Sequence, residues 1–241
     1  MSESYKTIKR GYDPSDRTDF SGEAMAILHK AQAEIQWLLD RGYNMKSVIN
    51  LTGNHYQLSS RQRTAIQRTT AAAPHYAGRE TSRLTISAVR GGCLNIDGFN
   101  LIIILEVALS GSPVFLGKDD VLRDLAGLRG TYRLIDKTDQ ALVLIGKTLT
   151  DLSISEAIFY LDENVSNSGR LKGRILEYAD EWGIPVEVDL VPDADMILAK
   201  MSNVVTGDSM ILDECVSWLN LSRIIVDEYI KEAWIVDFCD S

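Results

Sequence analysis

The sequence has few of the residues that build disulfide frameworks or zinc sites. Its 241 residues include three cysteines, Cys93, Cys215 and Cys239, which lie far apart and form no CxxC pair. An odd number of separated cysteines argues against a disulfide scaffold and a zinc knuckle. The three histidines form no HxxxH or HExxH pattern. Any bound metal is therefore expected to be a hard cation with oxygen ligands, Mg²⁺ or Mn²⁺.

Long apolar segments and several catalytic signatures are also missing. The longest apolar run, residues 101–109, contains Glu106 and is too short to span a bilayer. The polar start MSESYKTIKR does not have the pattern of a signal peptide. We therefore expect a cytoplasmic protein with no membrane contact. The absence of a Walker A sequence, a GxGxxG turn and a GxSxG elbow removes the common signatures of nucleotide-binding loops and α/β hydrolases.

Charge is distributed unevenly along the chain. The net charge of −9 argues against a protein that binds nucleic acid over its whole surface. Residues 55–90, however, contain six arginines, no lysine and one acid, Glu80, which gives this segment a net charge of +5 and leaves −14 for the rest. Such a segment either grips phosphates or is an ordinary solvated helix face, and the charge pattern favours neither alternative.

The first third of the chain has a helical pattern. Residues 1–20 are polar and are predicted to form a flexible N-terminus. Between residues 21 and 73, apolar residues recur every three or four positions, which predicts a module of three helices. The third helix begins at Ser59, which can form a capping box with Gln62, and is expected to end at Pro74. Residues 74–91 are predicted to be a connecting segment.

The pattern changes after Gly92, where short β-rich runs alternate with amphipathic segments. Strands are predicted at residues 93–96, 157–161, 186–190, 203–206 and 234–238, and the less clear stretch 113–146 is expected to hold one strand and two helices. Regular alternation of strands and helices indicates a mainly parallel sheet flanked by helices. The sequence thus predicts an α/β domain over residues 92–241, preceded by the helical module.

Acidic residues follow four successive predicted strands. They are Asp97, Asp162, the pair Asp193 and Asp195, and Asp208. Because ligands bind at the carboxyl ends of parallel strands, these side chains are expected to converge. A single aspartate is commonly a helix N-cap, and we assign that role to one member of the 193/195 pair. Several converging carboxylates repel one another unless a cation lies between them, and Mg²⁺ in such a site serves phosphodiester hydrolysis.

Two of these segments resemble a known nuclease family. Residues 95–101, Asn-Ile-Asp-Gly-Phe-Asn-Leu, resemble the opening strand of the NYN branch of the PIN-like nucleases, and residues 204–208, Val-Val-Thr-Gly-Asp, resemble a later PIN strand. The resemblance covers residues 92–239 and implies a PIN-like fold in which Asp97 and Asp208 bind the catalytic metal. It also implies a further acid in a helix, for which Glu106 and Asp124 are alternatives. Asp213 could be another ligand or a surface residue.

The whole chain also resembles an uncharacterised family, domain of unknown function four-hundred-and-thirty-four. The resemblance rests on residues 39–43 (LDRGY), 56–58 (YQL) and 61–63 (RQR), and on Asp162 with residues 165–170 (VSNSGR). It implies no activity.

Further polar residues are candidates for substrate binding. Ser168 and Arg170 enter a predicted helix whose N-terminus suits a phosphate, although a plain serine cap would have the same pattern. Arg61, Arg63 and Arg68 could hold a nucleic-acid backbone, or could form the charged face of a docking module. Asn100 could orient Asp97 or a metal-bound water, and Gly98 beside Asp97 is expected to let the backbone approach a ligand closely.

Together these features predict a metal-dependent nuclease, with RNA as the expected partner. Asp97, Asp162 and Asp208 are its predicted catalytic acids, and Asp97, Asp208, Asp213 and Glu106 its predicted metal ligands. The alternatives are a non-catalytic protein that binds nucleic acid or protein, and a small-molecule phosphatase. The sequence leaves the oligomeric state open, with a homo-oligomer among the alternatives.

Overall fold

The computed structural model describes residues 9–127 and 130–239, so that residues 1–8 of the predicted flexible N-terminus lie outside it. Its described part, residues 9–20, contains a short helix that the sequence did not predict. The helices are α1 (Asp16–Asp19), α2 (Gly22–Leu39), α3 (Met45–His55), α4 (Ser60–Thr69), α5 (Ala73–Ser82), α6 (Ile86–Val89), α7 (Gly98–Leu109), α8 (Asp136–Asp151), α9 (Ser168–Ala179), α10 (Ala194–Leu198), α11 (Ser209–Glu214) and α12 (Leu221–Tyr229). The strands are β1 (Cys93–Asp97), β2 (Val114–Leu116), β3 (Leu122–Arg123), β4 (Glu156–Asp162), β5 (Val186–Val191), β6 (Val204–Val205) and β7 (Ile235–Asp237).

The N-terminal helices form for reasons that are visible in the sequence. The Ser21 side chain accepts a hydrogen bond from the Ala24 amide at the start of α2. At the start of α4, Ser59 and Gln62 form the predicted capping box. Pro74, expected to end this helix, instead lies in the first turn of α5, where its missing N–H costs nothing. The predicted connecting segment 74–91 therefore contains two helices, α5 and α6.

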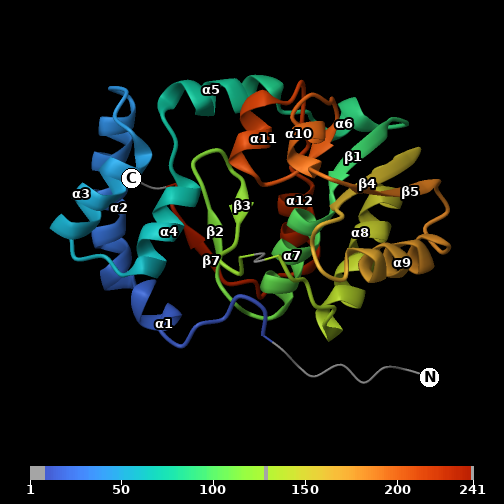
Figure 1. Ribbon diagram of the computed structural model, residues 1–241, viewed down its shortest axis with the longest axis horizontal. Coiled ribbons are helices and arrows are strands. Elements are labelled where there is room, and N and C mark those ends of the chain that lie inside the picture. Colours follow the sequence, from blue (N-terminus) through green and yellow to red (C-terminus); the bar gives the residue numbers. More distant parts are fainter. Residues whose placement is uncertain (1–8, 128–129, 240–241) are drawn as a thin grey trace.

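The helical module packs against a small sheet of three strands in the order β3-β2-β7. Strand β2 pairs antiparallel with β3 and parallel with β7. Figure 1 shows α2, α3 and α4 on one side of this sheet and the larger sheet on the other. Apolar side chains from α2, α3 and α4 share one buried cluster with Phe115, Val236 and Phe238. The last predicted strand thus exists, but it joins this second sheet because its partner is β2.

The larger sheet contains four parallel strands in the order β5-β4-β1-β6. Buried side chains alternate between its faces: Phe159 and Leu161 join the main core with α7, α8, α9 and α12, whereas Tyr160 joins a smaller core with α10 and α11. This is the predicted parallel sheet flanked by helices. The segment 113–146 differs from the prediction, since its described residues hold two short strands, β2 and β3, and the start of one helix, α8.

The strand order creates a reversal next to β1. From β1 the chain builds β4 and β5 on one side, and it then returns to place β6 on the other side. In parallel sheets a crevice opens at the carboxyl ends of the strands where the winding reverses. Residues that follow β1 and β6 therefore meet at this crevice. No helix in the described ranges is both long and apolar enough to cross a membrane.

Candidate functional site: an acidic pocket at the reversal

A pocket of about 300 Å³ lies at the carboxyl ends of β1, β4 and β6. It is lined by five aspartates and five other residues: Asp97, Asp124, Asp162, Asp195, Asp208, Arg68, Phe99, Asn100, Ile103 and Gly127. We call it the acidic pocket. The structure thus brings together the three predicted catalytic acids, Asp97, Asp162 and Asp208, as the strand-end pattern predicts.

Asp97 is the last residue of β1 and the N-cap of α7. Its Oδ1 atom accepts a hydrogen bond from the Asn100 amide at 3.2 Å, and its Oδ2 atom accepts one from the Thr206 hydroxyl at 2.8 Å. The side chain is buried, with 7% of its surface exposed. Burial raises the pKa of Asp97 to about 7 against the effect of these hydrogen bonds, and repulsion from Asp195 and Asp208 adds to the shift.

Gly98 has a packing role at this point, and the close approach of the backbone to a ligand stays a prediction. A Cβ atom at Gly98 would lie 2.6 Å from Leu161 Cδ2 and 3.3 Å from the carbonyl oxygen of Tyr160. Glycine is therefore needed because the start of α7 crosses close to β4.

Asp208 follows β6 and is the N-cap of α11, where its Oδ1 atom accepts a hydrogen bond from the Met210 amide at 2.8 Å. The turn before it is tied to α7, since Gly207 N donates to Asn100 Oδ1 at 2.7 Å. Asn100 therefore lies in the pocket as predicted, but its carboxamide oxygen already joins the turn after β6 to α7. This contact fixes the turn that carries Asp208 relative to the helix that Asp97 caps.

The pair that follows β5 divides into a cap and a pocket residue. Asp193 is the N-cap of α10 and accepts a hydrogen bond from the Met196 amide at 2.9 Å. Asp195, in contrast to Asp193, lines the acidic pocket. Desolvation raises the pKa of Asp195 to about 6, and repulsion from Asp208 and Asp162 contributes. The sequence indicates one cap in this pair, but it does not decide which carboxylate faces the pocket.

Asp162 ends β4 and accepts a hydrogen bond from the Ala194 amide at 2.9 Å. This contact links the end of β4 to α10, the helix that carries Asp195. Asp124, the alternative to Glu106 in the sequence, also lines the pocket and is buried. Its Oδ1 atom accepts a hydrogen bond from the Ala126 amide at 2.7 Å.

Arg68 is the one basic residue in the lining of the acidic pocket. It comes from α4 of the helical module, and its Nη1 atom donates to the carbonyl oxygen of Asp124 at 2.7 Å. Its side chain remains 45% exposed. Its guanidinium also lies 3.9 Å from a carboxylate oxygen of Asp124, so a cation from the first third of the chain is paired with an acid of the same pocket.

Glu106, a predicted metal ligand, lies outside this pocket in the main core. It is fully buried and forms an ion pair with Arg10 at 2.5 Å. The Tyr132 hydroxyl donates to its Oε1 atom at 2.6 Å, and the Thr138 hydroxyl donates to the same oxygen. Burial raises the pKa of Glu106 to about 7, and the pairing with Arg10 opposes this shift. Glu106 therefore belongs to a closed internal network.

Asp213 also lies outside the pocket lining. Its carboxylate pairs with Arg79 Nε at 2.7 Å and with His75 Nδ1 at 2.9 Å. The second turn of α11 places it away from the pocket, although its spacing from Asp208 made it a predicted ligand.

Two of the predicted phosphate-binding arginines have internal partners. Arg61 pairs with the buried Asp16 and donates to the carbonyl oxygen of Gly11 at 2.6 Å. Arg63 donates to Asn54 Oδ1 at 3.0 Å and to the carbonyl oxygen of Leu58 at 2.9 Å. These contacts tie the described residues before α1 to α4 and fix the turn between α3 and α4. Arg61 and Arg63 therefore have structural contacts within the described residues, and a phosphate contact for either stays a prediction.

Ser168 and Arg170 lie in the first turn of α9, outside the residues that line the acidic pocket. Ser168 is buried. The residue before the helix, Asn167, has φ +69° and donates from its side chain to the carbonyl oxygen of Tyr132 at 2.7 Å. This loop is thus held by the main core, and a phosphate contact there remains a prediction.

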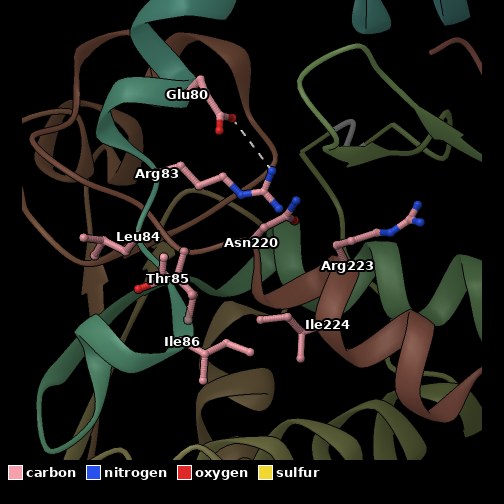
Figure 2. A pocket seen from close by; sticks show the side chains of 9 residues that line it. Glu80, Arg83, Leu84, Thr85, Ile86, Asn220, Arg223 and Ile224 are labelled. Carbon is pink, nitrogen blue, oxygen red and sulfur yellow. Dashed lines mark ion pairs between the residues drawn. The ribbon is translucent and has the colours of Figure 1, made fainter. Parts of the chain in front are cut away.

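A second pocket, of about 340 Å³, lies between α5, α6 and α12 (Figure 2). Its lining is mixed: apolar residues such as Leu84 and Ile224 lie beside Arg83 and Arg223. Arg83 pairs with Asp120 at 2.7 Å, and Arg223 pairs with Asp227 at 2.7 Å. The arginines of this second pocket already have acidic partners. The acidic pocket is therefore the stronger candidate for chemistry.

Among the described residues, no three histidine, cysteine, aspartate or glutamate side chains are close enough together to form a ready-made metal site. A zinc-type site, which needs three or four protein ligands, does not fit this arrangement. Mg²⁺ differs, because it keeps several waters and takes only one or two carboxylates from a protein. Asp97 and Asp208 line the same pocket from the ends of the neighbouring strands β1 and β6.

Comparison with known proteins identifies two families along the chain. A family described as domain of unknown function (DUF5616) matches residues 86–224, and one described as protein of unknown function (DUF434) matches residues 27–80. The predicted resemblance to DUF434 is thereby confirmed for residues 27–80, whereas Asp162 and residues 165–170, which it also included, lie in the part that matches DUF5616. An uncharacterised protein of Methanocaldococcus jannaschii is 32% identical over 185 residues, which cover 77% of this chain and 88% of that protein. No solved structure matched the chain.

Proposed function

We propose that this chain, which belongs to the family described as domain of unknown function (DUF5616), is a divalent-metal-dependent nuclease that acts on RNA. One observation carries the proposal: aspartates from the ends of three parallel strands line one pocket together with an arginine. Carboxylates serve a hard cation, and the arginine serves a phosphate. The pocket lies at the strand reversal, which is where parallel sheets bind their ligands.

The cation in this proposal is Mg²⁺ or Mn²⁺, held by Asp97 and Asp208. Both residues are helix N-caps, so one oxygen of each is oriented by a backbone amide. A carboxylate oxygen has a second lone pair, which leaves each group able to meet a cation. A bound cation supplies Lewis acidity for the attack of water on a phosphodiester. It would also relieve the repulsion between Asp97, Asp195 and Asp208 that accompanies their convergence.

The protein side chains then have separate tasks. Thr206 and Asn100 hold Asp97 and the turn before Asp208 in place. Asp162 and Asp195 add negative charge on the β4 side of the pocket, so an anionic substrate needs a compensating cation to enter. Arg68 provides a fixed positive charge at the same pocket, and we assign it the non-bridging oxygens of the scissile phosphate.

The resemblance to PIN-like nucleases supports the same assignment. The two segments that carry it are β1 with Asp97 and β6 with the residues up to Asp208. These strands are neighbours, with Asn95 paired to Val204 and Ile96 paired to Val205. Asp97 and Thr206 are 109 residues apart in the sequence. The acids of these two distant segments nevertheless line one pocket.

The proposal is tested by incubating the full chain with labelled single-stranded RNA in Mn²⁺ or in EDTA. We expect cleavage in Mn²⁺, none in EDTA, and none with Asp208→Asn. Asp193→Asn is the matched control, because Asp193 caps α10 beside the pocket without lining it, and asparagine is an equally good cap. Cleavage that persists in Asp208→Asn would exclude the assigned site. Turnover of a small phosphomonoester with no effect on RNA would indicate a phosphatase instead.

A further inference from the structure

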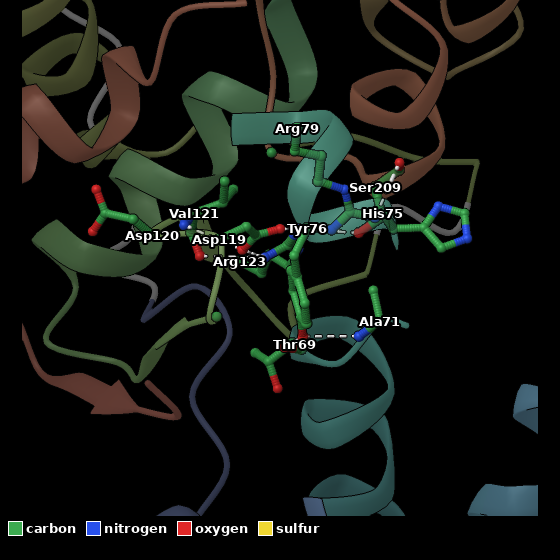
Figure 3. Close-up of polar contacts among 12 residues, drawn as sticks. Thr69, Ala71, His75, Tyr76, Arg79, Asp119, Asp120, Val121, Arg123 and Ser209 are labelled. Atoms are coloured by element: carbon green, nitrogen blue, oxygen red, sulfur yellow. Dashed lines mark hydrogen bonds and ion pairs between the residues drawn. The ribbon is translucent and has the colours of Figure 1, made fainter. Parts of the chain in front are cut away.

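A group of buried charged side chains contacts α11 and lies outside the lining of the acidic pocket (Figure 3). It consists of Arg79 from α5, Asp119 from the turn after β2 and Arg123 from β3, all buried. Asp119 Oδ2 accepts hydrogen bonds from Arg79 Nη1 and Arg123 Nη2, both at 2.6 Å, and its Oδ1 accepts one from Arg123 Nη1 at 2.8 Å. These arginines hold the pKa of Asp119 below its usual value against the effect of burial. We call this group the arginine clamp.

The arginine clamp is attached to the first turn of α11. Arg123 Nη2 donates to the hydroxyl of Ser209 at 3.1 Å, and Arg79 Nη2 donates to the carbonyl oxygen of Ser209 at 3.5 Å. Arg79 also reaches the second turn, where its Nε atom donates to Asp213 at 2.7 Å. Three contacts therefore hold α11 through Ser209 and Asp213, neither of which lines the acidic pocket.

Ser209 is the residue after Asp208, so the clamp acts directly next to the proposed metal ligand. On the other side of Asp208, the Gly207 amide is held by Asn100 at 2.7 Å. The Asp208 amide itself donates to the Thr206 hydroxyl at 3.0 Å. Hydrogen bonds therefore hold the chain at Gly207, Asp208 and Ser209. Of these three residues, only Ser209 is held by arginines.

We propose that Arg123 is a positioning residue that holds Asp208 in place for the cation, and that it acts through the hydroxyl of Ser209. The inference rests on the proposed function, because it assigns Asp208 to the metal. A carboxylate that caps a short helix moves with that helix, and α11 has only six residues. Substituting a group that orients a metal ligand typically weakens metal affinity by roughly 10–100-fold.

Ser209→Ala separates positioning from overall stability. It removes the hydroxyl that Arg123 contacts but leaves the ion pairs of Asp119 with both arginines intact. Ser209→Thr retains a hydroxyl at the same position. His75→Ala is the matched control, since His75 contacts α11 through Asp213 without contacting Ser209.

The experiment measures Mn²⁺ affinity of the full-length variants by calorimetry, beside their midpoints of thermal unfolding. We expect Ser209→Ala to bind Mn²⁺ about tenfold more weakly with little change in the unfolding midpoint. Ser209→Thr and His75→Ala should bind as wild type does. Equal Mn²⁺ affinity of wild type and Ser209→Ala would overturn the positioning role alone. If the wild-type protein binds no Mn²⁺, both this inference and the proposed function are wrong.

Discussion

The hydroxyl of Thr206 donates a hydrogen bond of 2.8 Å to Oδ2 of Asp97, although 109 residues separate them in sequence. The same hydroxyl accepts a hydrogen bond from the Asp208 amide at 3.0 Å. One buried oxygen therefore joins the two acids that flank the strand reversal. This relationship makes the geometry of the acidic pocket sensitive to a single atom.

We expect Thr206→Val to lower the free energy of unfolding by roughly 1–3 kcal/mol, because the Asp97 carboxylate and the Asp208 amide each lose a partner. Thr206→Ser keeps the hydroxyl and should lose much less. Denaturant unfolding of both variants checks the prediction. Equal stability of the valine and serine variants would show that the hydrogen bonds of the hydroxyl add no net stability.

Gly207→Ala is expected to disturb the turn before Asp208. A Cβ atom at this position would lie 2.9 Å from the carbonyl oxygen of Leu122 and 3.2 Å from Asn100 Oδ1. The backbone cannot yield as a flexible side chain would, so we expect a loss of about 1–3 kcal/mol in unfolding free energy. Gly173→Ala, in α9 with open space around it, is the control and should stabilise the protein by up to about 1 kcal/mol. Similar effects of the two substitutions would contradict the crowding at Gly207.

Glu106 gives a pH dependence of stability with a defined sign. Its pKa is raised from 4.5 to about 7 in the folded protein, so the unfolded chain releases this proton at lower pH. Between these two values the folded state binds more protons than the unfolded state, and stability falls as pH rises. Below pH 4.5 and above pH 7 the group adds no further slope.

We therefore expect the difference in unfolding free energy between wild type and Glu106→Gln to shift against wild type from pH 4.5 to 7. The pKa shift of Glu106 from 4.5 to about 7 corresponds to a change in this difference of roughly 3 kcal/mol at most. Urea titrations at several pH values measure the difference, which cancels the contributions of other groups. A difference that does not change with pH would mean that Arg10 keeps Glu106 ionised throughout.

Arg68 is expected to contact phosphate rather than to stabilise the fold. Arg68→Ala should weaken RNA binding and reduce the slope of log affinity against log salt by about one. Arg41→Ala is a suitable control, because the Arg41 guanidinium lies over the Trp37 ring on α2, outside the pocket lining. Fluorescence anisotropy with a labelled RNA analogue that resists hydrolysis, in the presence of Mg²⁺, measures binding without cleavage. An unchanged salt slope in Arg68→Ala would remove Arg68 from the proposed site.

The sequence by itself determined the local features of this protein. The capping box at Ser59 and Gln62 depends on side chains three residues apart, and it forms as predicted. The alternation of strands and helices after Gly92 determined a parallel sheet, because short apolar runs separated by amphipathic segments have few other ways to bury their surface. The same pattern placed Asp97, Asp162 and Asp208 at one edge of that sheet.

Only the tertiary structure decided which of the remaining charged residues face the acidic pocket. Glu106 and Asp213 have plausible spacing, but the first is enclosed by Tyr132 and Arg10 and the second is held by Arg79. The sequence also did not show that a second sheet forms. It predicts a strand at 234–238, but only the tertiary structure pairs β7 with β2 and separates both from the larger sheet. The physical reason is that spacing along a chain fixes which face of an element a side chain occupies, whereas the direction that face points depends on how distant elements pack.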